Sequence, residues 1–557
     1  MPKRIMSFAF VLLVGSLAIA QSQKLTKQQY WANTGLSGAD LESLPYFQKD
    51  SCTNNIKNFR ACIRGLSSLA SHGKNSLVIV PRSTASSDEI VKDFGPLVFA
   101  KAPDQKSDSS VNIYKYWQTE KARRDKIDLA ITRLFQDSSQ KNSIDFKQIV
   151  ESARENGLSE PSKEASFVAE ALNNYLIEAV DPHSHFDPTE ELIADNAGET
   201  EEFFGIGVEL ALLNGRLVIQ SPMEGSPALA AGIHRNDVVT MINGETLEKL
   251  DLTDIVAKIR GPLGTKVVLH ILRDGKESDI PIVRAKIVME NVTAKLITNA
   301  AGRKIGYMKL RNFVDSTSCR VIAMKIFEYQ RSGAKSLILD LRGNGGGLLQ
   351  QGVCIGNLFV GDKVIVKVKN LQSGEMQSVG TVIPSPITAL PLFLLIDAGS
   401  ASASEIVAGA LQDYNRALLI GEKSFGKATA QTPGPVKVNG KEVFKDKITL
   451  YTTIERFYQP SGRTNQIQGL IPDLTVPLKP DATDEERFAL READLFPNAL
   501  EAIGTPWKQP RPGLIKKIQS CMSKTGSARK EWTAHQNDAI SPDFQLLSAE
   551  DAANCAE

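Results

Sequence analysis

Two runs of large apolar residues, each ending in a turn of very small residues, most constrain the fold of this 557-residue chain. The runs span residues 337–339 and 392–396, and continuous apolar runs of this kind are typical of strands buried on both faces of a sheet. The first leads into residues 340–347 (DLRGNGGG) and the second into residues 397–405 (DAGSASASE), each followed by an apolar helical pattern. Backbone N–H groups at such a strand-to-helix turn can bind an anion, either a phosphate or an oxyanion.

The second turn contains serines close to the positive end of the expected helix, and a nucleophilic serine needs a base. None of the six histidines lies near the two turns in sequence. Lysine is the alternative base, provided that burial lowers its pKa enough to leave it neutral. In an extended strand Lys427, Thr429 and Gln431 would share one face, so that Gln431 can hold and orient the amine.

Four sequence segments are similar to the carboxyl-terminal processing peptidases, also called tail-specific proteases, a family of Ser-Lys serine peptidases. They are GSASASEI from residue 399, QDY from 412, GEKSFGK from 421, and Gln431. The resemblance implies a multidomain α/β fold: a crotonase/ClpP-like protease core with an inserted PDZ domain and a helical N-terminal region. It implies an exported serine endopeptidase that needs no cofactor.

The same resemblance assigns roles to individual residues. Ser402 would be the nucleophile, Lys427 the base and Gln431 its partner, with Asp413 as a further catalytic residue of less certain role. The oxyanion donors would be the N–H of Ala403 and one from the glycine turn, Gly346 or Gly347. Ser400 and Ser404 are rival nucleophiles without the family spacing, and Lys423 is a rival base that we expect to be solvated.

Residues 197–290 change to short alternating strands separated by glycine-containing turns. Two glycines stand directly before a strand, where successive N–H groups can form a nest for a carboxylate and the strand edge can pair with a peptide. The stretch resembles a PDZ domain of bacterial exported proteases. We expect it to bind proteins or peptides with apolar C-termini, through Phe204, Gly205, Ile206, Gly207 and Val208. A small β domain that binds nothing is the alternative.

The chain begins with a pattern typical of a secretory signal peptide over residues 1–20, with Lys3 and Arg4 before a short apolar stretch that ends in Ala-Ile-Ala. We therefore expect a secreted, and by preference periplasmic, bacterial protein with no stable membrane span. Export makes disulfides possible. Neighbourhood favours Cys52–Cys62 and Cys521–Cys555, whereas Cys319 and Cys354 either pair or stay free.

The predicted organisation is a signal peptide (1–20), a helical region (21–196), the PDZ domain (197–290), the peptidase core (291–480) and a C-terminal tail (481–557). Lys+Arg 65 against Asp+Glu 64 lacks the charge excess of a nucleic-acid binder. His183 and His185 without further ligands do not indicate a metal site. Two other functions stay open, a PDZ adaptor on an inactive scaffold and a partner-activated zymogen, with a lipoprotein adaptor as a possible partner. The sequence does not predict the oligomeric state.

Overall fold

The structure of the chain is a computed structural model. It describes residues 31–556 apart from 33, 72–76, 102–112, 159–162, 190–201, 214–215, 224, 235–236, 248–251, 274, 289, 300, 382, 439, 446, 485–486, 488, 497–498, 507–510 and 536–541. The predicted signal peptide of residues 1–20 lies outside the described residues. Within the described part of the chain, no helix is both long enough and apolar enough to cross a membrane.

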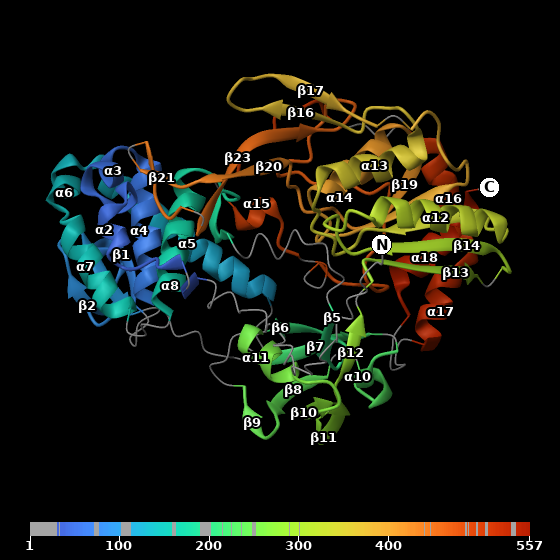
Figure 1. Cartoon of the computed structure of the whole chain (residues 1–557), viewed down its shortest axis with the longest axis horizontal. Coiled ribbons are helices and arrows are strands. Elements are labelled where there is room, and N and C mark those ends of the chain that lie inside the picture. The colour runs from blue at the N-terminus through green and yellow to red at the C-terminus, as the bar shows by residue number, and fades with distance from the viewer. Residues whose placement is uncertain are drawn as a thin grey trace, which may run out of the picture.

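The N-terminal region is built mainly of helices around one apolar core (Figure 1). The periodic stretches at 127–135 and 165–177 lie in helices, as predicted. The helices are α2 (Asp40–Ser43), α3 (Lys49–Thr53), α4 (Ile56–Ser71), α5 (Ile113–Gln136), α6 (Ser138–Ser143), α7 (Phe146–Gly157) and α8 (Glu164–Ala179), with short 3-10 turns at Pro45–Phe47 and Arg82–Thr84.

This region also contains a small antiparallel sheet that the helical prediction missed. Its strands β1 (Leu77–Pro81), β2 (Ile90–Asp93) and β3 (Leu97–Lys101) are ordered β1-β3-β2. Strands of four or five residues carry too few alternations for periodicity to identify them, since a short apolar run such as LVIVP fits a buried helix equally well.

The middle region is a separate β domain, drawn in green below the rest in Figure 1. Its antiparallel strands are ordered β11-β10-β8-β7-β6, so β6 is an edge strand. The strands are β6 (Val208–Leu213), β7 (Arg216–Pro222), β8 (Val238–Ile242), β9 (Glu245–Thr246), β10 (Lys266–Arg273) and β11 (Lys276–Val283), and the helices are α10 (Pro227–Ala230) and α11 (Leu252–Ile259). Before and after them, β5 (Glu202–Gly205) pairs with β12 (Ala285–Val288), which brings the entry and exit of the domain together.

The core is organised by one sheet ordered β13-β14-β15-β18-β19-β24, parallel except between its first two strands. The two apolar runs of the sequence form the adjacent central strands β15 and β18, as their composition predicted. The strands are β13 (Val292–Thr298), β14 (Lys304–Leu310), β15 (Ser336–Asp340), β18 (Leu392–Ile396), β19 (Ala417–Gly421) and β24 (Leu474–Thr475).

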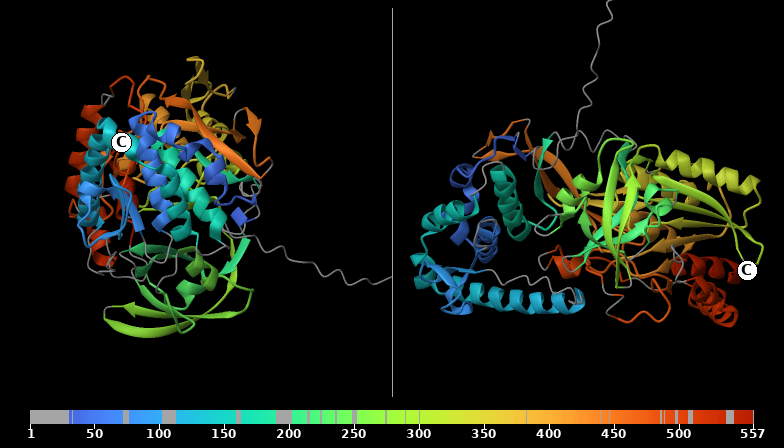
Figure 2. Two further views of the ribbon diagram at one scale, coloured as in Figure 1. Left: turned by 90° about the vertical axis from the view of Figure 1, so that its left-hand side faces the viewer. Right: turned by 90° about the horizontal axis from the view of Figure 1, so that it is seen from below.

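Helices cover both faces of this sheet. One face packs against α12 (Ser318–Arg331), α13 (Leu349–Val360) and α14 (Ala403–Asp413). The other face packs against α16 (Pro512–Thr525) and α18 (Phe544–Cys555), with α17 (Ser527–His535) beside them. The C-terminal segment therefore supplies one layer of the core, and Figure 2 shows these red helices at the end of the molecule opposite the helical region.

A second sheet joins the core to the helical region. It is ordered β17-β16-β23-β20, and β4 (His185–Pro188) of the N-terminal region pairs with the start of β23. Its strands are β16 (Val366–Asn370), β17 (Met376–Val379), β20 (Thr429–Pro435) and β23 (Ile448–Tyr458), with the hairpin β21 (Lys437–Val438) and β22 (Lys441–Glu442) beyond β20. Val436 and Ile448 belong to the apolar core of the helical region, so this ribbon connects the two parts (Figure 1).

The six cysteines form three pairs, Cys52–Cys62, Cys319–Cys354 and Cys521–Cys555. The first and third are those that neighbourhood favoured, and the second links α12 to α13. We expect a peptide mass map under non-reducing conditions to show these three pairs and no free thiol, because each pair is already in contact in the folded chain. Peptides joined in any other combination would contradict this fold.

Candidate active site

The second small-residue turn runs from β18 into α14 and holds Ser402 directly before the helix. Ser402 has φ +55°, a left-handed conformation that is costly for a residue with a Cβ and that concentrates at functional sites. Ser400 and Ser404 are fully buried, and their hydroxyls donate to the carbonyls of Leu341 (2.8 Å) and Asn344 (2.7 Å). Ser402 is therefore the one of the three serines that is partly exposed.

The glycine turn after β15 lies against Ser402. Gly346 has φ +106°, and a Cβ added to it would lie 2.8 Å from the Ser402 Cβ, so only glycine permits this approach. The Gly346 N–H donates to Asn344 Oδ1 (2.9 Å), which removes Gly346 from the predicted oxyanion donors. No described group accepts a hydrogen bond from the N–H of Gly347 or Ala403, and these two predicted donors are available.

Lys427 lies just before β20, and its Nζ donates to Gln431 Oε1 (3.0 Å), as the alternating pattern predicted. Burial lowers the pKa of Lys427 below its ordinary value. The Gln431 Nε2 donates to Thr453 Oγ1 (3.0 Å), which donates to Asp181 Oδ1 (2.7 Å). Because an ionised carboxylate can only accept, this chain of donors sets the Gln431 amide with its oxygen toward Lys427.

The carboxylate of Glu405, in the first turn of α14, joins the serine turn to the lysine loop. This residue was not predicted from the sequence. Its Oε2 accepts from the N–H of Ser402 and of Lys427, both at 3.0 Å. Its Oε1 accepts from the Ser424 hydroxyl (2.5 Å) and the Gly426 N–H (2.9 Å). The S-x-x-E spacing of residues 402–405 is a capping-box pattern and is the signal that could have identified it.

Glu405 is fully buried, and this burial raises its pKa to about 8 in spite of the four donors around it. Burial thus opposes the ionised form of Glu405, while the four donors around its two oxygens favour it.

Ser402 and Lys427 are held near each other through this shared carboxylate, but the structure gives no hydrogen bond between Ser402 Oγ and Lys427 Nζ. Catalytic hydrogen bonds in unliganded enzymes are often long and form fully only with substrate. Ser402 and Lys427 therefore belong to one connected group of residues.

Asp413, to which the resemblance gave a catalytic role of less certain kind, has its partners away from the serine turn. It stands at the C-terminal end of α14, eleven residues and therefore roughly 16 Å along the helix from Ser402. Its carboxylate pairs with Arg463 Nε (2.8 Å) and accepts from the Ser461 N–H (2.9 Å). Helical spacing placed it correctly on α14 but could not show how far that helix carries it from the turn.

Arg342 of the glycine turn and His183 of the turn before β4 each contact a residue of the C-terminal segment. Arg342, whose role the sequence left open, donates to Asp340 and to Asp543 at the start of α18 (2.5 Å each). His183 lies 2.9 Å from an oxygen of Glu492, which is fully buried at the start of α15 (Glu492–Leu495). No sequence pattern identified Asp543 or Glu492, because both contacts join segments some 200 to 300 residues apart.

No group of three or more His, Cys, Asp or Glu side chains suited to a metal ion is found among the described residues. His183 pairs with Glu492, and His185 Nε2 lies 3.0 Å from Asp187. Each of the two histidines thus has a carboxylate partner of its own.

The loop predicted to bind a carboxylate leads into the edge strand β6. Gly207 has φ +73°, and a Cβ added there would lie 2.5 Å from the Ser226 Cβ. Ile206 is buried, and its carbonyl accepts from the Ala228 N–H (2.9 Å). No described group accepts from the N–H of Ile206 or Gly207, and β6 is an edge strand, as the sequence indicated.

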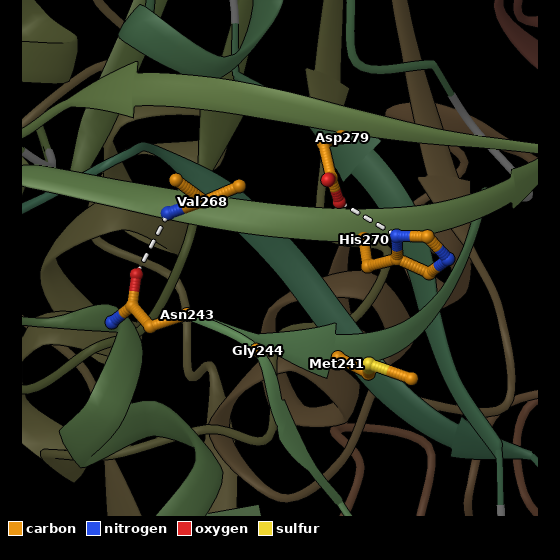
Figure 3. Close-up of a pocket in the computed structure, with 6 residues that line it drawn as sticks. All are labelled: Met241, Asn243, Gly244, Val268, His270 and Asp279. Carbon is orange, nitrogen blue, oxygen red and sulfur yellow. Dashed lines mark hydrogen bonds and ion pairs between the residues drawn. The ribbon is translucent and has the colours of Figure 1, made fainter.

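The β domain has a further hollow on the part of its sheet away from β6, formed by β8, β10 and β11 (Figure 3). There His270 Nδ1 lies 2.6 Å from Asp279 Oδ1, and Asn243 Oδ1 accepts from the Val268 N–H (2.9 Å). The hollow is lined by Met241, Asn243, Gly244, Val268, His270 and Asp279.

The raised pKa of Glu405 predicts a change of stability with pH. The pKa of Glu405 is raised from 4.5 to about 8 in the folded protein. Its contribution to stability is therefore fully present below pH 4.5 and is lost as the pH rises toward 8. Glu405→Gln removes the titration. We expect the melting temperature of the variant to fall less between pH 5 and pH 8 than that of the parent, measured by calorimetry in a Ser402→Ala background. Equal falls would contradict the raised pKa.

Comparisons with known proteins match two stretches of the chain. Residues 304–476 match the model of peptidase family S41, and residues 218–273 match that of a PDZ domain. A carboxy-terminal-processing protease of Bartonella bacilliformis is 32% identical over 350 residues, which are 62% of this chain and 78% of that protein. A probable CtpA-like serine protease of Staphylococcus aureus is 33% identical over 307 residues, and the match covers 55% of this chain and 59% of that protein.

Among solved structures, the photosystem II D1 C-terminal processing protease has 26% identity and a TM-score of 0.39, and the match covers 62% of this chain and 90% of that chain. A PDZ domain of the carboxy-terminal protease from Vibrio cholerae, solved with a peptide, has 32% identity and a TM-score of 0.15. That match covers 16% of this chain and 99% of that chain.

Proposed function

Because this chain belongs to peptidase family S41 and carries a PDZ domain, we propose that it is a serine endopeptidase that captures protein substrates by their C-terminal tails. One observation carries the proposal: Ser402, at a strained helix start, and Lys427, in its partly buried loop, are tied to the same carboxylate. A nucleophile and a base of lowered pKa, held together beside free N–H donors, are the parts needed for acyl transfer.

In the proposed reaction, neutral Lys427 accepts the proton of the Ser402 hydroxyl as the serine oxygen attacks the scissile carbonyl. The resulting oxyanion accepts hydrogen bonds from the N–H groups of Ala403 and Gly347. The Lys427 ammonium then donates its proton to the leaving amine, and an acyl-enzyme remains on Ser402. Lys427 next removes a proton from water, which hydrolyses the ester and restores the free serine.

The finer part of the proposal concerns how a substrate is chosen. The α-carboxylate of a tail would accept hydrogen bonds in the nest at Ile206 and Gly207, and its extended backbone would pair with β6. The edge of β6 offers backbone groups, which pair with any extended tail. A preference among tails therefore comes from the burial of their side chains, and this favours apolar ones. Both the free N–H groups and the edge position of β6 support this reading.

We also propose that the protein is exported, as the pattern of residues 1–20 predicts. Three disulfides support an oxidising compartment, because such bonds are rare where thiols are kept reduced. The non-reducing mass map of protein taken from its native compartment tests this point together with the pairing.

We expect Ser402→Ala and Lys427→Ala each to lower cleavage of an unfolded protein with an apolar tail by at least about 10³-fold, since each removes a member of the reacting pair. The release of peptides is followed by mass spectrometry. Lys423→Ala, which removes an exposed lysine four residues away, is the matched control and should keep the parent rate. Full activity in either of the first two variants, or tail binding without cleavage by the parent, would overturn the proposal.

The PDZ prediction uses Gly207→Ala, whose added Cβ would collide with Ser226 and distort the nest. We expect KM for the tailed substrate to rise about 10-fold while kcat at saturation changes little, because the change removes binding energy distant from the reacting bond. Gly275→Ala, at a glycine of similar φ with open space around it, is the control for backbone strain. Equal KM values for the parent and Gly207→Ala would show that tails do not bind in this nest.

A further inference from the structure

The C-terminal segment, beyond both stretches that match family models, lies directly against the loop that bears Lys427. Backbone and side-chain groups of this segment donate hydrogen bonds to that loop. The Glu492 N–H donates to the Phe425 carbonyl (3.1 Å), and Arg491 Nε donates to the Lys423 carbonyl (3.3 Å). In Figure 1, α15 lies between the core and the helical region, near the start of β20.

The Glu492 carboxylate itself is fully buried and fully engaged. His183 Nε2 lies 2.9 and 3.0 Å from its two oxygens, and Gln466 Nε2 donates to Oε1 (3.0 Å). Burying a carboxylate without such partners would cost several kcal/mol. One carboxylate thus brings together residues of the N-terminal region, the core and the C-terminal segment.

Gln466 connects this carboxylate to the base. Its Oε1 accepts from the N–H of Ala428 (2.7 Å), the residue after Lys427, while the neighbouring Asn465 donates to the Lys427 carbonyl (2.9 Å). Because Oε1 is occupied by an N–H, the Gln466 amide must present its Nε2 to Glu492. The position of the lysine backbone therefore depends on Glu492 through one side chain.

A buried lysine that takes a proton becomes a buried cation, and this charge needs an anion nearby. The acidic groups that act on Lys427 are Glu492 from α15, Asp181 from the turn before β4 and Glu405 from α14; His183 and His185 are the other titratable groups on this side. Glu492 has the largest effect of the three carboxylates. Burial raises the pKa of Glu405, which weakens its part as a negative charge near neutral pH.

We propose that Glu492 is a positioning residue for Lys427: it holds the loop that bears the base and supplies the negative charge that stabilises the ammonium formed when Lys427 takes the Ser402 proton. This inference rests on the proposed Ser402–Lys427 mechanism. It gives part of residues 481–557 a role in catalysis, so that the active site is complete only with the C-terminal segment in place.

The test measures the pH dependence of kcat and kcat/KM for full-length parent, Glu492→Gln and Glu492→Asp on one tailed substrate. Lys427 acts as the neutral amine, so activity rises with pH through its pKa. Loss of the anion makes the ammonium less stable. We expect Glu492→Gln to move the acid limb about one pH unit lower and to reduce the plateau kcat about 10- to 100-fold. Glu492→Asp, which keeps the charge, should keep the parent limb and recover part of the rate.

Glu501→Gln removes the same charge from an exposed position of the same segment and should leave both the limb and the plateau unchanged. Melting temperature and binding of a C-terminal peptide establish that the variants are folded. The inference would be overturned if Glu492→Gln lowered the plateau kcat without moving the acid limb. It would also be overturned if the acid limb lay at the same pH in the Glu492→Gln and Glu492→Asp variants.

If the Ser-Lys mechanism itself is wrong, the Ser402→Ala variant will cleave the substrate at the parent rate. This outcome is distinct from every result expected of the Glu492 variants.

Discussion

A single buried carboxylate, that of Glu405, determines the geometry on which this site depends. It accepts backbone or hydroxyl hydrogen bonds from Ser402, Ser424, Gly426 and Lys427, which belong to two loops about 20 residues apart. In a dry interior each donor left without its partner would cost of the order of 1–3 kcal/mol. The serine turn and the lysine loop are therefore held in one arrangement by the cost of separating them, before any substrate binds.

Around this carboxylate, the helical region adds one support and the C-terminal segment adds two. Asp181 of the helical region acts through Thr453 on Gln431, Glu492 of the C-terminal segment acts through Gln466 on the lysine loop, and Asp543 holds Arg342 beside the glycine turn. The stretch that matches the peptidase family, residues 304–476, contains Ser402, Lys427 and Gln431 but not these three. The neighbouring parts of the fold hold the side chain of Gln431 and the lysine loop in place.

Much of this arrangement could be predicted from short-range patterns. The apolar runs at 337–339 and 392–396 identified buried strands, which are adjacent in the sheet, and the alternation of an extended strand placed Lys427 and Gln431 within reach of each other. Spacing could not show distance along an element or the direction of a side chain. Asp413 shares the helix of Ser402 but lies at its other end, and of the two glycines left open as oxyanion donors Gly347 remains, because the Gly346 N–H donates to Asn344.

The sequence by itself determined the buried central strands and the turns that follow them, through local periodicity and glycine content, and the resemblance carried by its motifs implied the protease core with an inserted PDZ domain. Only the tertiary structure decided what surrounds the base. Glu492 and His183 are 309 positions apart, and Asp543 and Arg342 are 201 apart. No local pattern links such residues. Their contacts exist because the folded chain brings these segments side by side, where buried charges must find partners.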